Sequence, residues 1–187
     1  MANQLILGLT GFSGTGKTTV SNHLARKHGF ELFEGSYWIK EAAKATGQTL
    51  TDRSSYEEMF REQQRQKGVS WLADMMLRSD SERVVQVGLR SKYDLLRIKQ
   101  AGGAVIALEC APEICIERVD RANAKNPRTA KEYLAHQLLE TSCDEFGSNT
   151  PWVVAHADYT VDTSGLEEIT FSLVDSIVYE LREQGRS

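Results

Sequence analysis

The chain has 187 residues, 41% apolar and 26% charged, and this length and composition predict a single domain over residues 1–187 with a good hydrophobic core. The formal net charge of −4 gives no overall attraction to nucleic acid or to an anionic membrane, so neither is expected as a partner. No apolar run approaches the roughly 18 residues of a membrane-spanning helix and the first residues lack a basic targeting segment, so a cytoplasmic location is expected.

The first predicted element is a strand over residues 5–10, followed by a glycine-rich segment. Residues 11–18 read Gly-Phe-Ser-Gly-Thr-Gly-Lys-Thr and match the phosphate-binding pattern G-x-x-x-x-G-K-S/T. The glycines let backbone N–H groups surround a phosphate, and a helix beginning near Lys17 directs its positive end at the same group. Lys17 is expected to reach the β- and γ-phosphates of ATP, and the Thr18 hydroxyl is a suitable ligand for Mg²⁺. The predicted nucleotide-binding residues of this loop are Gly11, Ser13, Gly14, Thr15, Gly16, Lys17, Thr18 and Thr19.

Strands and helices are predicted to alternate along the rest of the chain. Short apolar runs indicate further strands over residues 31–33, 84–87, 105–109 and 159–161. The first helix is expected to end at Gly29, which suits a helix C-cap. This alternation is typical of consecutive βαβ units, so the predicted fold class is α/β, with a five-stranded parallel sheet flanked by helices.

The later helices are located by capping signals and apolar spacing. Three S/T-x-x-E patterns, beginning at Ser55, Thr129 and Ser164, predict capping boxes, and Pro112 suits the first position of a helix. Two groups of apolar residues at helical spacing are predicted to pack in the core rather than to bind a cofactor or a partner. These groups are Trp71, Leu72, Met75 and Met76, and Leu166, Ile169, Leu173, Val174 and Ile177.

Ligands of an open parallel sheet collect beyond the carboxyl ends of its strands, so polar residues that follow the strands are candidate site residues. Glu34 follows the second strand, Arg90 the third, and Glu109 ends the fourth. The helix after the fourth strand and the segment beyond it carry a group of basic residues that includes Arg118, Arg121, Lys125 and Arg128. Several arginines can stabilise a migrating phosphoryl group, although a basic helix face that only meets solvent is the alternative for this group.

The phosphate loop and these residues resemble small P-loop kinases of the adenylate kinase and dephospho-coenzyme A kinase group, over nearly the whole chain. Residues 84–91, Val-Val-Gln-Val-Gly-Leu-Arg-Ser, are similar to the V-V-x-D-G-x-R-S segment of a kinase-like branch, and residues 157–168 to its last strand and turn. The resemblance implies a P-loop NTPase three-layer fold. It also implies transfer of the γ-phosphoryl group of ATP, with Mg²⁺, to a small-molecule acceptor.

The resemblance implies roles for several segments. Residues from about 36 to 69 would form a helical acceptor-binding flap in which Lys40 stands near the usual phosphate-binding arginine. Residues from about 122 to 146 would form a mobile lid, and residues 163–165 would lie beside the adenine. The predicted catalytic residues are Lys17, Arg90, Arg121 and Arg128, and Arg118 is a further predicted cofactor-binding residue.

The chain departs from this family at the end of the third strand. The relatives carry an Asp there that helps to hold the water shell of Mg²⁺, whereas this chain has Val87, which cannot do so. Either Glu34 or Glu109 takes over this role, or metal binding depends on Thr18 and the phosphates themselves. A third possibility is a protein that binds nucleotide without efficient transfer.

The leading hypothesis is therefore an ATP- and Mg²⁺-dependent kinase whose acceptor is small and nucleotide-like, such as a nucleoside monophosphate. The alternatives are a nucleotide-binding regulatory protein with weak or no transfer, and an NTPase switch, which the absence of a hydrophobic run ending in Asp-Glu disfavours. The four histidines are scattered in the sequence and are not expected to form a nucleophile–base pair. Cys110, Cys115 and Cys143 form no C-x-x-C pair and are expected to be reduced thiols. The acceptor and the oligomeric state are left open.

Overall fold

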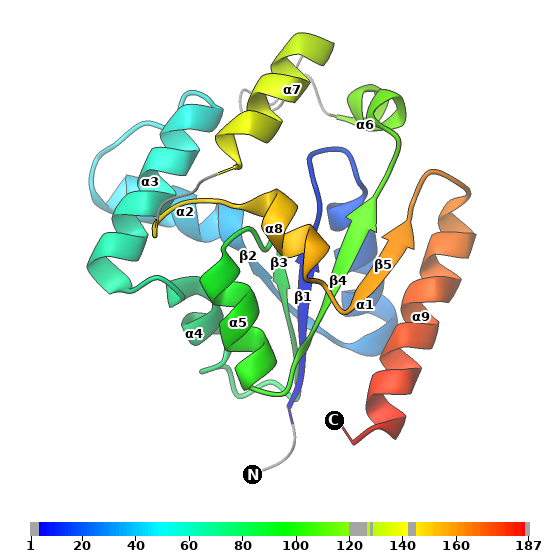
Figure 1. Ribbon diagram of the computed structural model, residues 1–187. Helices are drawn as coiled ribbons and strands as arrows, with labels where there is room; N and C mark the ends of the chain where they lie inside the picture. The colour runs from blue at the N-terminus through cyan, green and yellow to red at the C-terminus, as the bar shows by residue number, and fades with distance from the viewer. Residues whose placement is uncertain (1–3, 120–126, 128, 142–144, 186–187) are drawn as a thin grey trace.

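The computed structural model describes residues 4–119, 127, 129–141 and 145–185, and in this part of the chain five parallel strands form one sheet in the order β2-β3-β1-β4-β5 (Figure 1). The strands are β1 (Leu5–Thr10), β2 (Glu31–Glu34), β3 (Arg83–Val87), β4 (Ala104–Glu109) and β5 (Tyr159–Asp162). Each strand lies within one residue of its predicted bounds. The predicted α/β fold with a five-stranded parallel sheet is therefore confirmed.

Helices cover both faces of the sheet and its carboxyl edge (Figure 1). They are α1 (Lys17–His28), α2 (Gly35–Ala45), α3 (Arg53–Lys67), α4 (Trp71–Met76), α5 (Lys92–Gln100), α6 (Pro112–Arg118), α7 (Ala130–Leu139), α8 (Thr150–Ala155) and α9 (Glu167–Glu183). Helices α1 and α9 pack on one face, and α4, α5 and α8 on the other. Helices α6 and α7 lie beyond the carboxyl ends of the strands. In the described part of the chain, no helix has both the length and the apolar character needed to cross a membrane.

Alternate residues of β1 build the two halves of the core. Leu7 and its neighbours two residues away point to the face where Leu24 of α1 and Val174 of α9 pack. Ile6 points to the opposite face and contacts the cluster that contains Ile98 of α5 and Met76 of α4. Because both faces are covered, the strand reads as one apolar run rather than as an alternating pattern. This packing fixes the carboxyl edge of the sheet on which the candidate site is built.

The three predicted capping boxes have different outcomes. Thr129 caps α7 as predicted, because its hydroxyl accepts the N–H of Glu132 at 3.1 Å. The box predicted at Ser55 is wrong, because α3 begins earlier and Asp52 is its cap. The Asp52 carboxylate accepts the N–H of Ser55 at 2.9 Å, and the Ser55 hydroxyl accepts the N–H of Asp52. Asp52 and Ser55 thus form a capping box three residues upstream of the predicted one, and the helix starts at this box.

The box predicted at Ser164 is also wrong. The cap residue of α9 is Leu166, which makes no side-chain capping bond. Ser164 serves the turn instead, because its hydroxyl accepts the N–H of Ala111 at 3.3 Å and its own N–H donates to Asp162. Pro112 occupies the first turn of α6 as predicted.

The predicted core stripe of α9 is half wrong. Val174 and Ile177 are buried, but Leu166, Ile169 and Leu173 are exposed. The buried face is rotated and also includes Thr170, Asp175, Val178 and Leu181. Because Thr170 and Asp175 are polar, the apolar spacing of this face is interrupted in the sequence. The other predicted group packs as expected, with Trp71, Leu72 and Met76 buried and Met75 partly buried.

Candidate active site

A cavity of about 700 Å³ lies at the carboxyl edge of the sheet. One end is formed by the phosphate loop and by the turn between β5 and α9. The other end is formed by α2 and α3, by the turn after β3, and by Ser148, which precedes α8. The location follows from the fold, because β1 and β3 are neighbours and the segments that follow them leave the sheet at the same edge.

The phosphate loop has the backbone form that its glycines allow. Gly11, Gly14 and Gly16 have φ angles of 135°, 84° and 82°, in the region that favours glycine. Gly16 is the N-cap of α1, so the first N–H groups of that helix face the loop without a capping side chain. An anion placed there meets backbone N–H donors and the positive end of the helix dipole.

Contacts from distant segments hold the loop in place. The Thr15 hydroxyl donates to the Phe12 carbonyl at 2.9 Å, and the Thr163 hydroxyl donates to the Thr15 carbonyl at 3.1 Å. The phenol of Tyr133, on α7, donates to the Ser13 carbonyl at 3.3 Å. The loop is therefore fixed from the β5–α9 turn and from the predicted lid.

The predicted loop residues divide into two groups. Lys17 bridges the loop, because its ammonium donates to the carbonyls of Gly11 and Phe12 at 2.6 Å each. Gly11 and Thr15 are buried and shape the loop from behind. The residues that line the cavity are Ser13, Gly14, Gly16, Lys17, Thr18 and Thr19. Thr18 and Thr19 are exposed.

The two candidate carboxylates after the strands differ in position. Glu34, half-buried at the N-cap of α2, lines the cavity. Glu109 is exposed and does not line it, and its backbone carbonyl accepts two hydrogen bonds from Thr163. Val87 lines the cavity with 8% of its surface exposed. Of these two carboxylates, Glu34 is the one that lines the cavity.

The four predicted arginines are only partly placed. Arg118 lines the end formed by the phosphate loop and donates to the Thr163 carbonyl at 2.9 Å. Arg90 lines the opposite end, beside α3, where it pairs with Glu140. Arg121 and Arg128 lie outside the described residues. The structure thus brings Lys17, Arg90 and Arg118 to one cavity.

Sequence reasoning missed Arg53 and Glu140. The Glu140 carboxylate, only 2% exposed, accepts from Arg53 at 2.7 Å and from Arg90, and its second oxygen accepts from the Thr150 hydroxyl at 2.8 Å. One buried carboxylate therefore holds two arginines that line the cavity, and it joins the end of α7 to α3 and to the turn after β3. Lys40, which was expected near an acceptor phosphate, is exposed and does not line the cavity.

A second missed carboxylate, Glu57 of α3, lines the end of the cavity opposite the phosphate loop. It accepts from the backbone N–H and from the hydroxyl of Ser148, both at 2.6 Å, and Arg61 lies 3.8 Å away. Apolar side chains complete this end of the cavity. They are Ile39, Tyr56, Phe60 and Leu72. The end of the cavity beside α3 therefore combines apolar walls with arginines and carboxylates that are already paired with one another.

A buried polar pair, Gln86 and Asp94, also lines the cavity. Asp94 lies in the first turn of α5 and is 1% exposed, and it accepts from the Gln86 side-chain N–H at 3.1 Å and from the Ala73 backbone N–H at 3.2 Å. Burial raises the pKa of Asp94 to about 7, even though both hydrogen bonds oppose this shift. The side-chain oxygen of Gln86 is buried without a hydrogen-bond partner in the described structure. A buried acceptor of this kind is costly unless a ligand hydroxyl or amine reaches it.

The remaining candidate groups lie elsewhere. Cys110 and Cys115 are free thiols, and Cys143 lies outside the described residues. Burial raises the pKa of the Cys115 thiol, which favours its neutral form. His23 and His28, both on α1, converge on Asp175 away from the cavity, and this cluster contains no nucleophile.

The protein is a phosphate-loop α/β protein of the kinase type. This class is indicated by the order of the strands, by the loop between β1 and α1, and by the cavity that this loop lines together with the arginines. A family model described as an AAA domain matches residues 7–140, and the chain belongs to this P-loop family. The expected relationship to P-loop kinases is thus confirmed. No curated protein matches the chain.

Solved structures show the same fold at low sequence identity. Shikimate kinase from Bacteroides thetaiotaomicron is similar with a TM-score of 0.63 and 16% identity, over 94% of this chain and 98% of the other. Shikimate kinase from Acinetobacter baumannii, in complex with shikimate, has a TM-score of 0.61 and 18% identity, over 96% of both chains. A putative kinase from Chloroflexus aurantiacus has a TM-score of 0.62 and 17% identity, over 95% of this chain and 98% of the other. The three-layer fold is therefore shared with kinases along nearly the whole chain.

Proposed function

We propose that the protein is a phosphotransferase that moves the γ-phosphoryl group of ATP to a small-molecule acceptor. The observation that carries this proposal is the single cavity, with the phosphate loop at one end and a pocket of apolar, arginine and carboxyl side chains at the other. A donor phosphate on the loop and an acceptor beside α3 would meet inside it. Positioning and charge stabilisation supply most of the catalysis in such reactions.

The residues around the cavity fit ATP with Mg²⁺. The loop N–H groups and Lys17 would hold the β- and γ-phosphates, and Arg118 lies where it can add charge beside the β5–α9 turn. The Thr18 hydroxyl and the Glu34 carboxylate are hard oxygen ligands, which Mg²⁺ prefers, directly or through its waters. When bound, Mg²⁺ would neutralise charge that develops on the phosphates. The flap over residues 36–69 and the lid over residues 122–146 remain predictions of the kinase resemblance.

The charges of the acceptor end favour a hydroxyl-bearing acceptor without a phosphate of its own. Arg53 and Arg90 share Glu140, and Arg61 lies beside Glu57. A phosphate dianion would have to compete with these carboxylates for the arginines, whereas a hydroxyl can be recognised by Glu57 or by the unpartnered oxygen of Gln86. Arg121 and Arg128, predicted for the lid, could still serve a nucleoside monophosphate. We therefore rank a neutral or singly charged hydroxyl compound first and the nucleoside monophosphate second.

A nucleotide-binding regulatory protein is the second candidate function, and Val87 is the observation that favours it. Its side chain occupies the cavity wall where related kinases carry an Asp, and it is 8% exposed. This alternative predicts ATP binding without turnover. Restoring the carboxylate with Val87→Asp would then increase transfer from a near-zero level.

The deciding experiment measures ADP formation from ATP and Mg²⁺ with a panel of acceptors. The panel includes shikimate, other small polyols, nucleosides, nucleoside monophosphates and dephospho-coenzyme A. We expect turnover only with an acceptor present, and a loss on the order of 10²–10³-fold for Lys17→Ala. ATP binding without acceptor-dependent turnover across the panel would reject the kinase and leave the regulatory protein.

A matched pair of variants tests the assignment of the carboxylate. Glu34→Gln replaces a carboxylate that lines the cavity by a neutral amide, and Glu109→Gln makes the same change at a carboxylate that does not line it. Glu34→Gln is expected to raise the Mg²⁺ concentration needed for half-maximal turnover at least several-fold, with Glu109→Gln close to the parent protein. Equal effects of the two substitutions would contradict the assignment to Glu34.

A further inference from the structure

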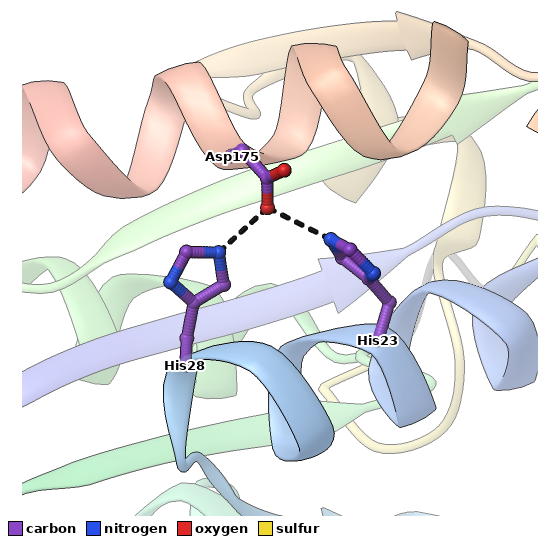
Figure 2. Close-up of side chains that lie close together, drawn as sticks. All are labelled: His23, His28 and Asp175. Carbon is purple, nitrogen blue, oxygen red and sulfur yellow. Dashed lines mark hydrogen bonds and ion pairs between the residues drawn. The ribbon is translucent and has the colours of Figure 1, made fainter. Parts of the chain in front are cut away.

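A second cluster of chemically active side chains lies outside the cavity, between α1 and α9 (Figure 2). The Nε2 atoms of His23 and His28 lie 2.8 Å and 2.6 Å from the same oxygen, Oδ1 of Asp175. The three ligand atoms lie within 4.8 Å of one another. In the part of the chain that the structure describes, this is the single group of three such side chains close enough to share an ion.

The packing holds the cluster in its present orientation. The His28 side chain is 2% exposed, and those of His23 and Asp175 are mostly buried. The His23 ring stacks on Phe171 with centroids 4.1 Å apart, and the His28 ring meets the ring of Tyr179 edge-on at 5.7 Å. Three polar side chains that are already ordered and turned toward one point lose little conformational freedom when they bind an ion.

The donor set suits a divalent transition metal. Two imidazole nitrogens and one carboxylate oxygen are typical ligands of Zn²⁺, and they leave a fourth position for water. Tetrahedral ligands about 2.0–2.1 Å from Zn²⁺ lie about 3.3 Å from one another, so the histidine nitrogens would move roughly 0.5–0.7 Å away from Asp175. To coordinate through Nε2, each ring must be neutral and carry its proton on Nδ1 rather than on the Nε2 that now contacts Oδ1 of Asp175.

Lys27 pairs with Asp175 and must be compatible with an ion at this cluster. Its ammonium donates to the other oxygen of Asp175, Oδ2, at 2.7 Å. The bond to Lys27 uses Oδ2, so Oδ1 faces the two histidines and can bind the metal while the bond to Lys27 persists. Hydrogen bonds of this kind commonly support carboxylates that bind metals. The Lys27 side chain is 49% exposed, so it can also turn toward solvent.

We propose that His23, His28 and Asp175 form a binding site for a divalent first-row transition metal, with Zn²⁺ as the ion that this donor set fits best. The site joins α9 to α1, the helix that begins at the phosphate loop. Bound metal therefore crosslinks two helices that pack on the same face of the sheet and stabilises the folded chain. This metal is separate from the Mg²⁺ of the proposed reaction, because the cluster does not line the cavity.

Titration of the chelator-treated full chain with Zn²⁺, without nucleotide, tests the site. Calorimetry is expected to give one equivalent bound at micromolar or lower concentrations, with a rise in Tm. In the parent protein, NMR is expected to show the imidazole resonances of His23 and His28 shifting with Zn²⁺ while that of His156 stays in place. This measurement needs no variant and is independent of any kinase activity. Absence of a bound equivalent, or unchanged resonances of His23 and His28, overturns the proposal.

Variants give a second test. His23→Gln and Asp175→Asn are each expected to weaken Zn²⁺ binding at least tenfold, whereas His156→Gln, which removes a histidine outside the cluster, leaves it unchanged. Circular dichroism of each metal-free variant reports whether it folds. Binding of Zn²⁺ by a folded His23→Gln protein at the parent affinity would place the metal elsewhere, for example on a cysteine, and contradict the site.

Discussion

The buried carboxyl group of Asp94 gives a quantitative prediction of how stability depends on pH. Its pKa in the folded protein is raised from an ordinary value of 3.8 to about 7, with burial as the main cause. A raised pKa means that the folded chain holds the proton more tightly than the unfolded chain does. Protonated Asp94 therefore makes its full contribution to the free energy of unfolding below about pH 4, and this contribution is lost as the pH rises through about 7.

The size of the effect follows from the two pKa values. Each pKa unit corresponds to about 1.4 kcal/mol, so the whole shift amounts to about 4 kcal/mol. Unfolded chains already ionise Asp94 near about pH 5, which leaves about 2.5 kcal/mol to be lost between about pH 5 and about pH 8. Asp94→Asn cannot ionise and removes this part of the pH dependence. Its amide can still accept the N–H of Ala73, which lies 3.2 Å from Asp94 Oδ1.

Urea unfolding of the parent protein and of Asp94→Asn at both pH values measures this quantity. The free energy of unfolding of the parent, relative to that of the variant, is expected to fall by about 2.5 kcal/mol from the lower to the higher pH. Asp80→Asn, which changes an exposed carboxylate, is the control and should show no such change. A parent–variant difference that is the same at both pH values would refute the raised pKa and the reasoning from burial.

Three further outcomes are expected from the same structure. Gln86→Leu removes a hydrogen bond that lowers the pKa of Asp94, so NMR titration should give a higher Asp94 pKa in this variant than in the parent. Glu140→Gln removes the charge of a buried carboxylate that binds two arginines. It should lower the free energy of unfolding, measured in urea, by about 2–4 kcal/mol. The control Glu62→Gln, in an exposed pair, should change it by less than about 0.5 kcal/mol. Thr129→Ala removes the cap of α7 and should speed amide exchange in that helix by an amount that corresponds to about 1 kcal/mol.

Most of the fold could be predicted because its signals are local. A strand of a covered parallel sheet is an uninterrupted apolar run, and β1 is such a run with every residue buried. The prediction failed where a local signal has more than one use. Ser164 has the spacing of a capping residue but bonds the N–H of Ala111 across the turn. Asp175 is not part of the predicted apolar stripe of α9, yet it lies on the buried face of that helix, held by two histidines and a lysine.

The candidate site likewise has one part that the sequence predicts from local signals and one part that depends on contacts between distant residues. The phosphate loop is contiguous, so residues 11–18 carried its whole signal and the predicted loop glycines have the required positive φ angles. The end of the cavity beside α3 is built from pairs that are far apart in the sequence: Arg53 and Glu140 are 87 positions apart, and Glu57 and Ser148 are 91 positions apart. No spacing rule joins such partners, because only the folded sheet brings α3, α7 and α8 to one edge. The charges on which the proposed acceptor class depends are therefore a property of the tertiary structure, and we accordingly rank a hydroxyl-bearing acceptor above a phosphate-bearing one.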